Sequence, residues 1–379
     1  MNRPALFSFF SGLGFLDLGF EKAGFEIVLV NEKHPSFLVA YRFARGRLGI
    51  GQPICGYFEG DVKDFLEEPA KIRSLSAEMK SLRARGRLVG FVGGPPCPDF
   101  SVGGKNRGRA GDHGKLSGTF AELVCQQQPD FFLFENVKGL WHTKRHREFY
   151  EELKTHLHGA GYVTAERLIN AIEYGVPQDR PRILLAGFKR AFLEDRGIAV
   201  GGAGNGASTI PQEAFPWTAL APYPGRAAFE YDWPERDPFE EESERPCPDG
   251  LPQELTVEYW FRENDVANHP NSVHCFKPRA GLARFRSVDE GDDSRKSFKR
   301  LHRWRYSPTV CYGNNEVHLH PYRPRRISAA EAMALQSLPN GFELPEDMSL
   351  SDMFKGIGNG VPYRASELIA KAILAFVGQ

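Results

Sequence analysis

Cys97 is the residue whose surroundings most strongly indicate chemistry. It stands in the run Gly93-Gly-Pro-Pro-Cys-Pro-Asp-Phe-Ser101, directly after the apolar segment 88–92, which is typical of a buried strand. Proline fixes φ and removes a backbone donor, so the run predicts a stiff, irregular turn. A thiol held beyond a strand end is where an α/β enzyme would place a nucleophile. On composition alone, a half-buried structural cysteine is the simpler interpretation, so the choice depends on the residues around it.

A carboxylate and two guanidinium groups accompany other apolar runs. Glu135 follows the strand-like run 131–134, and Arg180 and Arg182 precede the last such run. Because the carboxyl ends of parallel strands meet at one ligand crevice, we expect Glu135 to lie beside Cys97. A partly desolvated glutamate can hold a proton near neutral pH. Taken singly, Glu135 could instead cap a helix, and the arginines could form a surface pair.

A glycine turn follows the first strand-like run, in the sequence Phe10-Ser-Gly-Leu-Gly14. Glu32 lies 18 residues after Gly14, the spacing of an acid that binds ribose hydroxyls in dinucleotide folds. Asp17 stands where a pyrophosphate site needs its third glycine, which favours a nucleoside cofactor without phosphates, such as S-adenosylmethionine. Asp61, in Gly60-Asp-Val, could present a second acid to an adenine amino group. Taken alone, such a glycine turn is often only a turn.

The elements that must position these residues alternate along the first half of the chain. The strand-like runs are 6–10, 27–30, 88–92, 131–134 and 183–188, and helix-like stretches such as 16–23 and 145–158 lie between them. This alternation predicts an α/β fold with a mainly parallel sheet and helices on both faces. Beyond the glycine-rich stretch 200–206, the chain loses clear periodicity, which predicts a second, loop-rich domain. Helical pattern returns after Ser328, which forms a capping-box pattern with Glu331, and again at 362–376.

Length and charge bound the class of protein. A chain of 379 residues exceeds one compact core, so two domains are expected. The 48 basic and 48 acidic residues balance overall, but their distribution is uneven. Residues 232–249 hold eight acids and two bases, and residues 276–305 hold ten bases and four acids. A local basic face can bind phosphates in a neutral protein, although each run taken alone is more simply a solvated surface.

Cysteine usage and hydropathy argue against other classes. The six cysteines are scattered and form no Cys-x-x-Cys pair, which argues against a zinc ribbon and a disulfide scaffold and favours a reducing cytoplasm. We see no signal peptide, and no stretch reaches the ~18 apolar residues of a membrane span. We therefore expect a cytoplasmic protein with no metal and no membrane partner.

Together these segments resemble the DNA cytosine-5 methyltransferases. The resemblance covers about 1–190 and 323–379, in the order that the family's motifs follow, and as a set it is highly specific. The similar stretches are Phe10-Ser-Gly-Leu-Gly, Asn31-Glu, Gly60-Asp-Val, Pro95-Pro-Cys-Pro-Asp-Phe-Ser, Phe134-Glu-Asn-Val, Gln178-x-Arg-x-Arg, Arg326-Ile-Ser-x-x-Glu-x-x-x-Leu-Gln and Gly358-Asn-Gly-Val.

The resemblance implies a Rossmann-like, S-adenosylmethionine-dependent methyltransferase fold with a mixed, mainly parallel sheet. A catalytic domain would occupy 1–190, a smaller loop-rich target-recognition domain 191–322, and a segment completing the catalytic domain 323–379. The implied partner is double-stranded DNA. The implied enzyme is the modification half of a restriction-modification system, acting as a monomer. A cognate restriction endonuclease would act on the same site without a stable complex.

The resemblance also implies roles for individual residues. Cys97 would attack C6 of a cytosine flipped out of the duplex, forming a covalent intermediate, and Glu135 would hold N3 and supply its proton. Arg182 would grip O2, and Arg180 would support the site. The residues expected around S-adenosylmethionine are Phe10, Ser11, Gly12, Gly14, Glu32, Asp61, Val62, Pro96, Asn359 and Val361. The expected DNA contacts are Ser101, Lys105, Arg107, Arg300, Arg303, Arg305 and Thr309.

Two residues depart from the family pattern, and two alternatives remain. Phe15 stands where the family usually has glycine, which could reshape the methionine end of the cofactor site, and Pro98 replaces a glutamine that faces DNA. An RNA cytosine-5 methyltransferase of the same fold and a non-catalytic DNA-binding protein are the alternatives. A zinc cytidine deaminase is excluded, because Phe100 stands where its second cysteine is needed.

Overall fold

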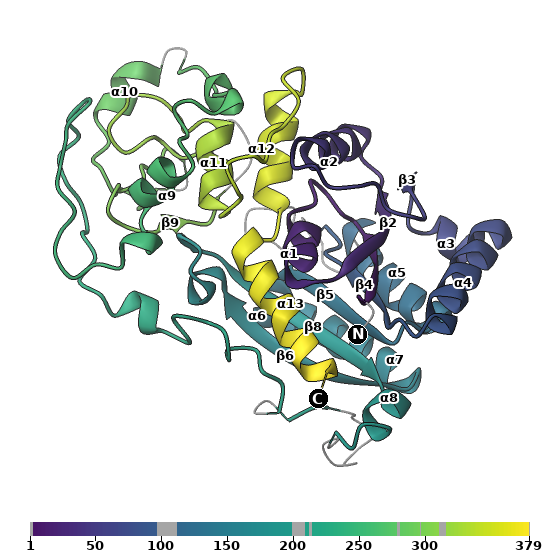
Figure 1. Ribbon diagram of the computed structural model, residues 1–379. Coiled ribbons are helices and arrows are strands. Elements are labelled where there is room, and N and C mark those ends of the chain that lie inside the picture. Colours follow the sequence, from purple (N-terminus) through teal and green to yellow (C-terminus); the bar gives the residue numbers. More distant parts are fainter. Residues whose placement is uncertain are drawn as a thin grey trace.

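A seven-stranded sheet forms the centre of the larger region of the molecule (Figure 1). The computed structural model describes residues 3–96, 112–198, 209–211, 214–278, 281–295, 297–310 and 316–378. The strand order is β3-β2-β1-β4-β5-β8-β6. The strands are β1 (Ala5–Phe9), β2 (Glu26–Glu32), β3 (Tyr57–Glu59), β4 (Val89–Gly93), β5 (Phe131–Val137), β6 (Tyr162–Asn170) and β8 (Pro181–Lys189). Among these strands β8 alone runs in the opposite direction to the others, so the predicted mixed, mainly parallel sheet is confirmed.

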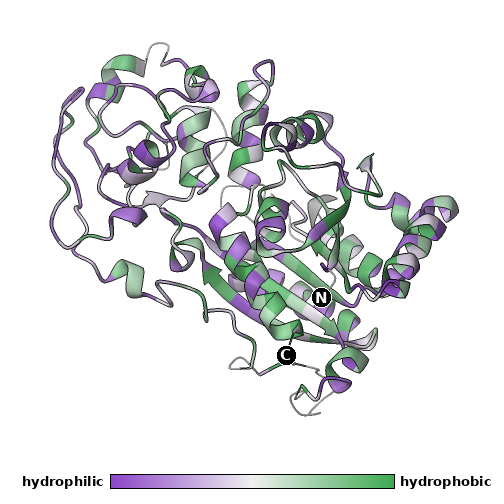
Figure 2. Cartoon of the chain, in the orientation of Figure 1, coloured by the Kyte–Doolittle hydropathy of each residue, from purple (hydrophilic) through white to green (hydrophobic). Residues whose placement is uncertain are grey.

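Helices cover both faces of this sheet, because side chains alternate between the faces along each strand. In β1, Phe7 and Phe9 pack toward α3 to α7, whereas Leu6 packs toward α1, α2 and α13. The strands are accordingly largely green in Figure 2, since both of their faces are buried. The helices of this part are α1 (Phe15–Ala23), α2 (Pro35–Arg47), α3 (Asp64–Glu67), α4 (Pro69–Ala84), α5 (Asp112–Gln127), α6 (Lys138–His142), α7 (Lys144–Gly159), η2 (Ala171–Tyr174) and α8 (Arg190–Glu194).

The recognition region, which we define as the described residues between 209 and 310, contains only short elements. They are η3 (Ala227–Phe229), η4 (Gln253–Leu255), α9 (Val257–Glu263), η5 (Pro270–Val273), α10 (Leu282–Arg286) and β9 (Ser307–Pro308), which pairs in parallel with β7 (Gln178–Asp179). Figure 1 shows this region beside the sheet, on the side of α11 and α12. Few regular elements mean that other groups must satisfy its backbone.

The chain then returns to the sheet through α11 (Ala329–Leu335), α12 (Leu350–Asn359) and α13 (Tyr363–Val377). The predicted capping box is confirmed: Ser328 accepts from the Glu331 backbone N–H, and the Glu331 side chain accepts from that of Ser328. α13 packs along α1, and an apolar cluster joins α1 and α2 to α9, α11 and α12. The carboxyl-terminal segment thus completes the fold around the sheet.

The strands β3 and β6 were not predicted from the sequence. β6 is an edge strand in which the charged residues Glu166 and Arg167 interrupt the apolar run. β3 has three residues and no fully buried side chain. Both strands lack the continuous apolar character that identifies central strands.

Candidate active site

The carboxyl ends of β1, β4 and β5 lie at one edge of the sheet. Phe9 pairs with Gly93, and Gly93 pairs with Phe134, so the segments that follow these strands lie side by side. Arg182, on β8, reaches Glu135 from the other side of β5. The structure therefore brings together the glycine turn, the run that leads to position 97, and the Glu135–Arg182 pair.

Glu135 is a buried carboxylate held by a guanidinium group. Its Oε1 lies 2.9 Å from Arg182 Nε, and its side chain is 9% exposed. Gly94 leaves room for it, because a Cβ at that position would lie 2.9 Å from Oε2. Burial raises the pKa of Glu135 above the ordinary 4.5, although the charges of Arg182 and Arg180 oppose the rise. A carboxyl group in this setting can hold a proton for transfer to a bound base.

Neither of the simpler interpretations of these residues fits the structure. Glu135 lies within β5, which continues to Val137, so it is not a helix cap. Arg180 is fully buried, and Arg182 is 13% exposed at its side chain, so the two do not form a surface pair.

Asn136, which the sequence analysis did not single out, ties β5 to the end of β4. Its Nδ2 lies 3.5 Å from the Pro95 carbonyl oxygen and 3.4 Å from Ser117 Oγ. Its Oδ1 accepts from the Val137 backbone N–H at 2.8 Å. The amide thereby fixes the backbone of the proline run. Its place beside Glu135 in the Glu-Asn-Val stretch was the signal that could have identified it.

Five residues that the sequence places at the reaction or at DNA lie outside the described residues. They are Cys97, Pro98, Ser101, Lys105 and Arg107. Pro96 is the last residue described before them and is partly buried. Pro96 directly precedes Cys97 in the sequence, and the roles of these five residues stay predictions.

Arg180 contacts the carboxyl-terminal segment rather than the Glu135 carboxylate. Its Nη2 donates to the carbonyl oxygens of Gly358 and Gly360, each at 2.8 Å. Its backbone N–H donates to Asn170 Oδ1 at 2.8 Å. Arg180 therefore positions the backbone on either side of Asn359, and its charge also acts on Glu135.

Glu32 lies at the end of β2 and faces the glycine turn, as its spacing predicts. Its Oε2 accepts from the Gly12 backbone N–H at 2.8 Å, and its Oε1 accepts from the His34 backbone N–H at 2.8 Å. Ser11 Oγ donates to the Asn31 carbonyl oxygen at 3.0 Å. Phe10 adopts a left-handed φ of 55°, unusual for a bulky residue and typical of a functional turn. A buried carboxylate thus borders a strained turn.

Asp61 follows β3 and lies near the same edge. Its Oδ2 lies 2.8 Å from Lys33 Nζ, and its Oδ1 accepts from the Lys63 backbone N–H at 3.0 Å. Burial opposes ionisation, but these contacts outweigh it and lower the pKa of Asp61. Asn31 Nδ2 donates to the Gly60 carbonyl oxygen at 2.9 Å, and Val62 is buried. The acid is therefore held charged beside an apolar wall.

Asp17 points away from this edge into a buried network. It accepts from Ser8 Oγ at 2.7 Å and from the Tyr41 hydroxyl at 2.9 Å. Burial raises its pKa above the ordinary value. Gly14, with a φ of 86°, lets Tyr41 approach, because a Cβ there would lie 2.5 Å from the ring. Asp17 thus supports the glycine turn through Ser8 and Tyr41, on the buried side of the turn.

Phe15 packs against the carboxyl-terminal segment, not into an open site. It is buried, and a Cβ at Gly360 would lie 2.2 Å from its ring. Its ring meets that of Phe342 edge-on at 5.2 Å between centroids. Of the two expected cofactor residues beside Gly360, Asn359 is exposed and Val361 is buried. Phe15 therefore joins the glycine turn to the segment that carries Asn359.

The structure corrects two predicted DNA contacts, Arg300 and Arg303. Arg300 is 1% exposed, and its guanidinium donates to backbone carbonyl oxygens, among them those of Val288 at 2.8 Å and Arg323 at 3.0 Å. Arg303 is 3% exposed and donates to both oxygens of Glu290, at 2.8 and 2.9 Å. Both side chains hold the recognition region together, so neither is available to DNA.

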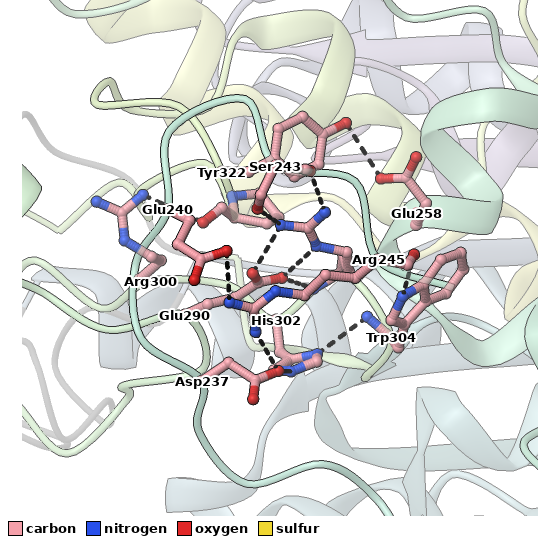
Figure 3. Close-up of polar contacts among 12 residues, drawn as sticks. Asp237, Glu240, Ser243, Arg245, Glu258, Glu290, Arg300, His302, Trp304 and Tyr322 are labelled. Carbon is pink, nitrogen blue, oxygen red and sulfur yellow. Dashed lines mark hydrogen bonds and ion pairs between the residues drawn. The ribbon is translucent and has the colours of Figure 1, made fainter. Parts of the chain in front are cut away.

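The acidic run 232–249 folds against the basic run, which explains this burial. Figure 3 shows Asp237 beside His302 and Ser243 near Tyr322, all within one polar cluster. Asp237 and Glu290 exchange backbone hydrogen bonds at 3.0 and 2.9 Å. At the periphery, Glu241 pairs with Arg286 and Glu242 with Arg323. Among the described residues of the basic run, Arg286 and Arg303 are therefore paired with carboxylates, and Arg300 donates to backbone carbonyl oxygens.

Arg305 and Thr309 keep partly exposed side chains beside the active-site segments. Thr309 Oγ1 donates to the Asp179 carbonyl oxygen at 2.6 Å, next to Arg180. Within the described part of the chain, no carboxylate lies within ion-pair distance of Arg305. These two residues remain candidates for contact with DNA.

Neither a metal cluster nor a membrane-spanning helix occurs within the described ranges. No group of three or more His, Cys, Asp or Glu side chains there is arranged to hold a metal ion. No helix there is long and apolar enough to cross a membrane.

The chain is similar to known proteins over nearly its whole length. The model of a family described as C-5 cytosine-specific DNA methylase matches residues 5–375. The Type II methyltransferase M.NmeDI of Neisseria meningitidis serogroup C is 52% identical over 376 residues, which are 99% of this chain and 84% of that protein. The Type II methyltransferase M.FnuDI of Fusobacterium nucleatum is 27% identical over 397 residues, covering 97% of this chain and 93% of that protein.

Solved structures share the fold at low identity. A protein from an E. coli prophage, described as a DNA modification methyltransferase, has a TM-score of 0.64 at 21% identity and covers 99% of this chain and 100% of its own. The Dnmt2 methyltransferase of S. pombe has a TM-score of 0.57 at 13% identity and covers 98% of this chain and 99% of its own. Together with the family match, these neighbours confirm the predicted methyltransferase fold.

The family match spans both regions of the molecule, and the relative at 52% identity covers almost all of the chain. The chain therefore belongs to the C-5 cytosine-specific DNA methylases and is a DNA (cytosine-5-)-methyltransferase of the Type II restriction-modification kind.

Proposed function

We propose that this enzyme methylates C5 of a cytosine flipped out of a specific double-stranded DNA sequence, through a covalent bond between Cys97 and C6. The observation that carries the proposal is the buried Glu135 carboxyl, paired with Arg182 at the sheet edge to which β4 leads the proline run before Cys97. A nucleophile, a proton donor and a cation at one edge are the groups that this reaction needs.

The described residues fit S-adenosylmethionine, the methyl donor that the family uses. Glu32 presents a buried carboxylate that can accept from ribose hydroxyls, and Asp61 presents a second acid beside apolar Val62. Lys33, the cation nearest these acids, is already paired with Asp61, which suits a cofactor without phosphates. Phe10, Ser11, Gly12 and Gly14, with Pro96, Asn359 and Val361, would complete the site.

The first step activates a carbon that is a poor nucleophile. The Cys97 thiolate adds to C6, and the electron pair of the C5–C6 double bond shifts through the ring toward N3. Glu135 donates its proton to N3, while Arg182 holds O2 and stabilises the developing charge. The raised pKa of Glu135 keeps the proton available for this transfer.

The remaining steps restore the aromatic ring. When bound, S-adenosylmethionine supplies the methyl group for C5 as a sulfonium substituent. A base then takes the C5 proton, the C5–C6 double bond re-forms, and the Cys97 thiolate leaves. N3 returns its proton to Glu135, so the protein ends the cycle unchanged.

The target carbon is buried in duplex DNA, so the cytosine must leave the stack, at a cost of a few kcal/mol. Arg305 and Thr309 lie on the partly exposed segment next to Asp179 and would contact DNA near the flipped base. Ser101, Lys105 and Arg107 would also contact the DNA. We propose that the enzyme acts as a monomer and protects sites that a cognate restriction endonuclease cleaves, without a stable complex between the two.

Label transfer tests the proposal. Protein incubated with methyl-labelled S-adenosylmethionine and mixed-sequence duplex DNA should place the label on cytosine C5, and the Cys97→Ala variant should place none. Label on tRNA but not on duplex DNA would favour the RNA alternative. DNA binding without label on either would favour the non-catalytic alternative.

A further inference from the structure

Two buried glutamines connect the recognition region to the segment expected to hold the cofactor. Gln178 and Gln336 are both fully buried. Gln178 Oε1 accepts from the Val310 backbone N–H at 3.1 Å. Gln178 Nε2 lies 3.3 Å from Gln336 Oε1, and Gln336 Nε2 donates to the Ile357 carbonyl oxygen at 2.6 Å.

The orientation of both amides follows from their backbone partners. Gln178 Nε2 also donates to the Leu335 carbonyl oxygen at 3.0 Å, so its other atom must be the oxygen that faces Val310. Gln336 faces the Ile357 carbonyl with its nitrogen, which leaves its oxygen for Gln178. The chain of hydrogen bonds therefore has one consistent direction, and neither amide can flip without facing like atoms together.

We call residues 356–361 the cofactor segment, because they include the expected cofactor residues Asn359 and Val361. Hydrogen bonds from other side chains order the backbone of this segment. The segment contains Gly356, Gly358 and Gly360, and glycine backbone is costly to order. Gln336 holds the carbonyl of Ile357, and Arg180 holds those of Gly358 and Gly360. A segment fixed in this way is ordered before the cofactor arrives, which lowers the cost of binding.

The recognition end is fixed by the same side chain. Val310, which Gln178 holds, directly follows Thr309, and the backbone N–H of Ser307 in β9 donates to the Pro177 carbonyl oxygen at 2.8 Å. Gln178 therefore contacts the recognition end directly at Val310 and reaches the cofactor segment through Gln336, whereas Gln336 contacts the cofactor segment directly at Ile357.

We propose that Gln178 and Gln336 are positioning residues: Gln336 orders the cofactor segment, and Gln178 orders both that segment and the DNA-contacting segment at Thr309. The proposal rests on the proposed function. It distinguishes the two residues, because Gln336 should affect binding of the cofactor alone, whereas Gln178 should affect binding of both the cofactor and DNA.

Binding measurements separate the two roles. Dissociation constants for S-adenosylhomocysteine and for mixed-sequence duplex DNA would be measured separately by calorimetry on full-length protein. Gln336→Leu should weaken the binding of S-adenosylhomocysteine about tenfold and change the affinity for DNA by less than about twofold. Gln178→Leu should weaken both ligands by about five- to tenfold. In turnover, Gln336→Leu should raise KM for S-adenosylmethionine with little change in kcat.

A matched control is Gln127→Leu, on the far face of the sheet, where Gln127 accepts from Ser76 Oγ at 2.8 Å. This variant should be less stable, but its affinities for S-adenosylhomocysteine and for duplex DNA should not change. If Gln336→Leu does not fold, Gln336→Asn removes the reach to Ile357 and is measured in the same way. The inference is overturned if the folded Gln336 variant binds S-adenosylhomocysteine with unchanged affinity. It is also overturned if that variant loses affinity for S-adenosylhomocysteine and for DNA equally. Failure of the unsubstituted protein to bind S-adenosylhomocysteine would instead overturn the proposed function.

Discussion

Buried arginines occur in both regions of the molecule, and they do different work. At the sheet edge, Arg182 pairs with Glu135, the carboxyl that we place against the cytosine, although Arg180 nearby binds the carbonyl oxygens of Gly358 and Gly360. In the recognition region, Arg300 and Arg303 bind carbonyl oxygens and a buried carboxylate that no strand satisfies. Where strands pair the backbone, side chains are left for chemistry, and where they do not, side chains must complete the fold.

The largest expected effect that tests this comparison is at Glu135. Glu135→Gln removes the exchangeable proton but keeps the shape, so kcat should fall by about 10²–10⁴ while DNA affinity stays the same. Because the pKa of Glu135 is raised and its protonated form is the donor, kcat/KM of the unsubstituted enzyme should fall as pH rises through that value. Pre-steady-state label transfer across a pH series would measure both.

The control for Glu135 is Glu166→Gln on β6, whose partner is Lys154 at 3.1 Å. It removes a partly buried carboxylate two strands away from Glu135, on the edge strand, and should leave kcat unchanged. Full activity in Glu135→Gln, or equal loss in both variants, would contradict the division between chemical and structural charges.

Arg303 should show the opposite pattern, a large loss of stability with little effect on chemistry. Arg303→Met leaves Glu290, which is 1% exposed, buried without its partner, so the free energy of unfolding should fall by about 3–5 kcal/mol. Urea denaturation would measure it. The double variant Arg303→Met/Glu290→Gln should recover part of the loss, and no recovery would show that the pair is not the source of the stability.

The contact between Phe15 and Gly360 should give a smaller effect. Gly360→Ala places a Cβ 2.2 Å from the Phe15 ring, so the ring or the segment must move, at about 1–3 kcal/mol of stability, with weaker S-adenosylhomocysteine binding. Phe15→Ala in the same chain removes the clash and should restore part of both quantities. A purely additive double variant, measured by denaturation and calorimetry, would rule out the direct contact.

Arg305 should give the smallest effect, and on DNA only. Arg305→Ala should weaken duplex DNA binding by about 1 kcal/mol and change the free energy of unfolding by less than about 0.5 kcal/mol. Lys80→Ala, an exposed cation on α4, is the charge-matched control and should change neither. Fluorescence anisotropy at several salt concentrations would detect the change. Equal salt dependence in all three proteins would remove Arg305 from the interface.

Much of the catalytic region could be predicted from the sequence, and the reason is physical. Central parallel strands bury both faces, so their apolar runs stand out, and strand order places the residues that follow them. Glu32 and Glu135 were placed at the right edge in this way. By contrast, Asn136 and Gln336 act through partners distant in the chain, which a local pattern does not contain.

The side-chain contacts of the recognition region could not be predicted from the sequence in the same way. The density of bases at 276–305 predicted a DNA-binding face, but charge in a sequence carries no information about what covers it. Residues of the acidic run 232–249 supply that cover, because Phe239 lies over the Arg300 guanidinium and Ser243 Oγ accepts from Arg303. Arg300 and Arg303 were misassigned for this reason.

The most direct test of the central claim is a trapping experiment with duplex DNA that carries 5-fluorocytosine in place of cytosine, in the presence of S-adenosylmethionine. Fluorine at C5 cannot leave as a proton, so the bond between the protein and C6 should persist. We predict a protein–DNA adduct that survives denaturation, maps to Cys97 by peptide mass analysis and is absent in Cys97→Ala. Methylation of ordinary DNA without any such adduct, or an adduct at another cysteine such as Cys125, would contradict the account.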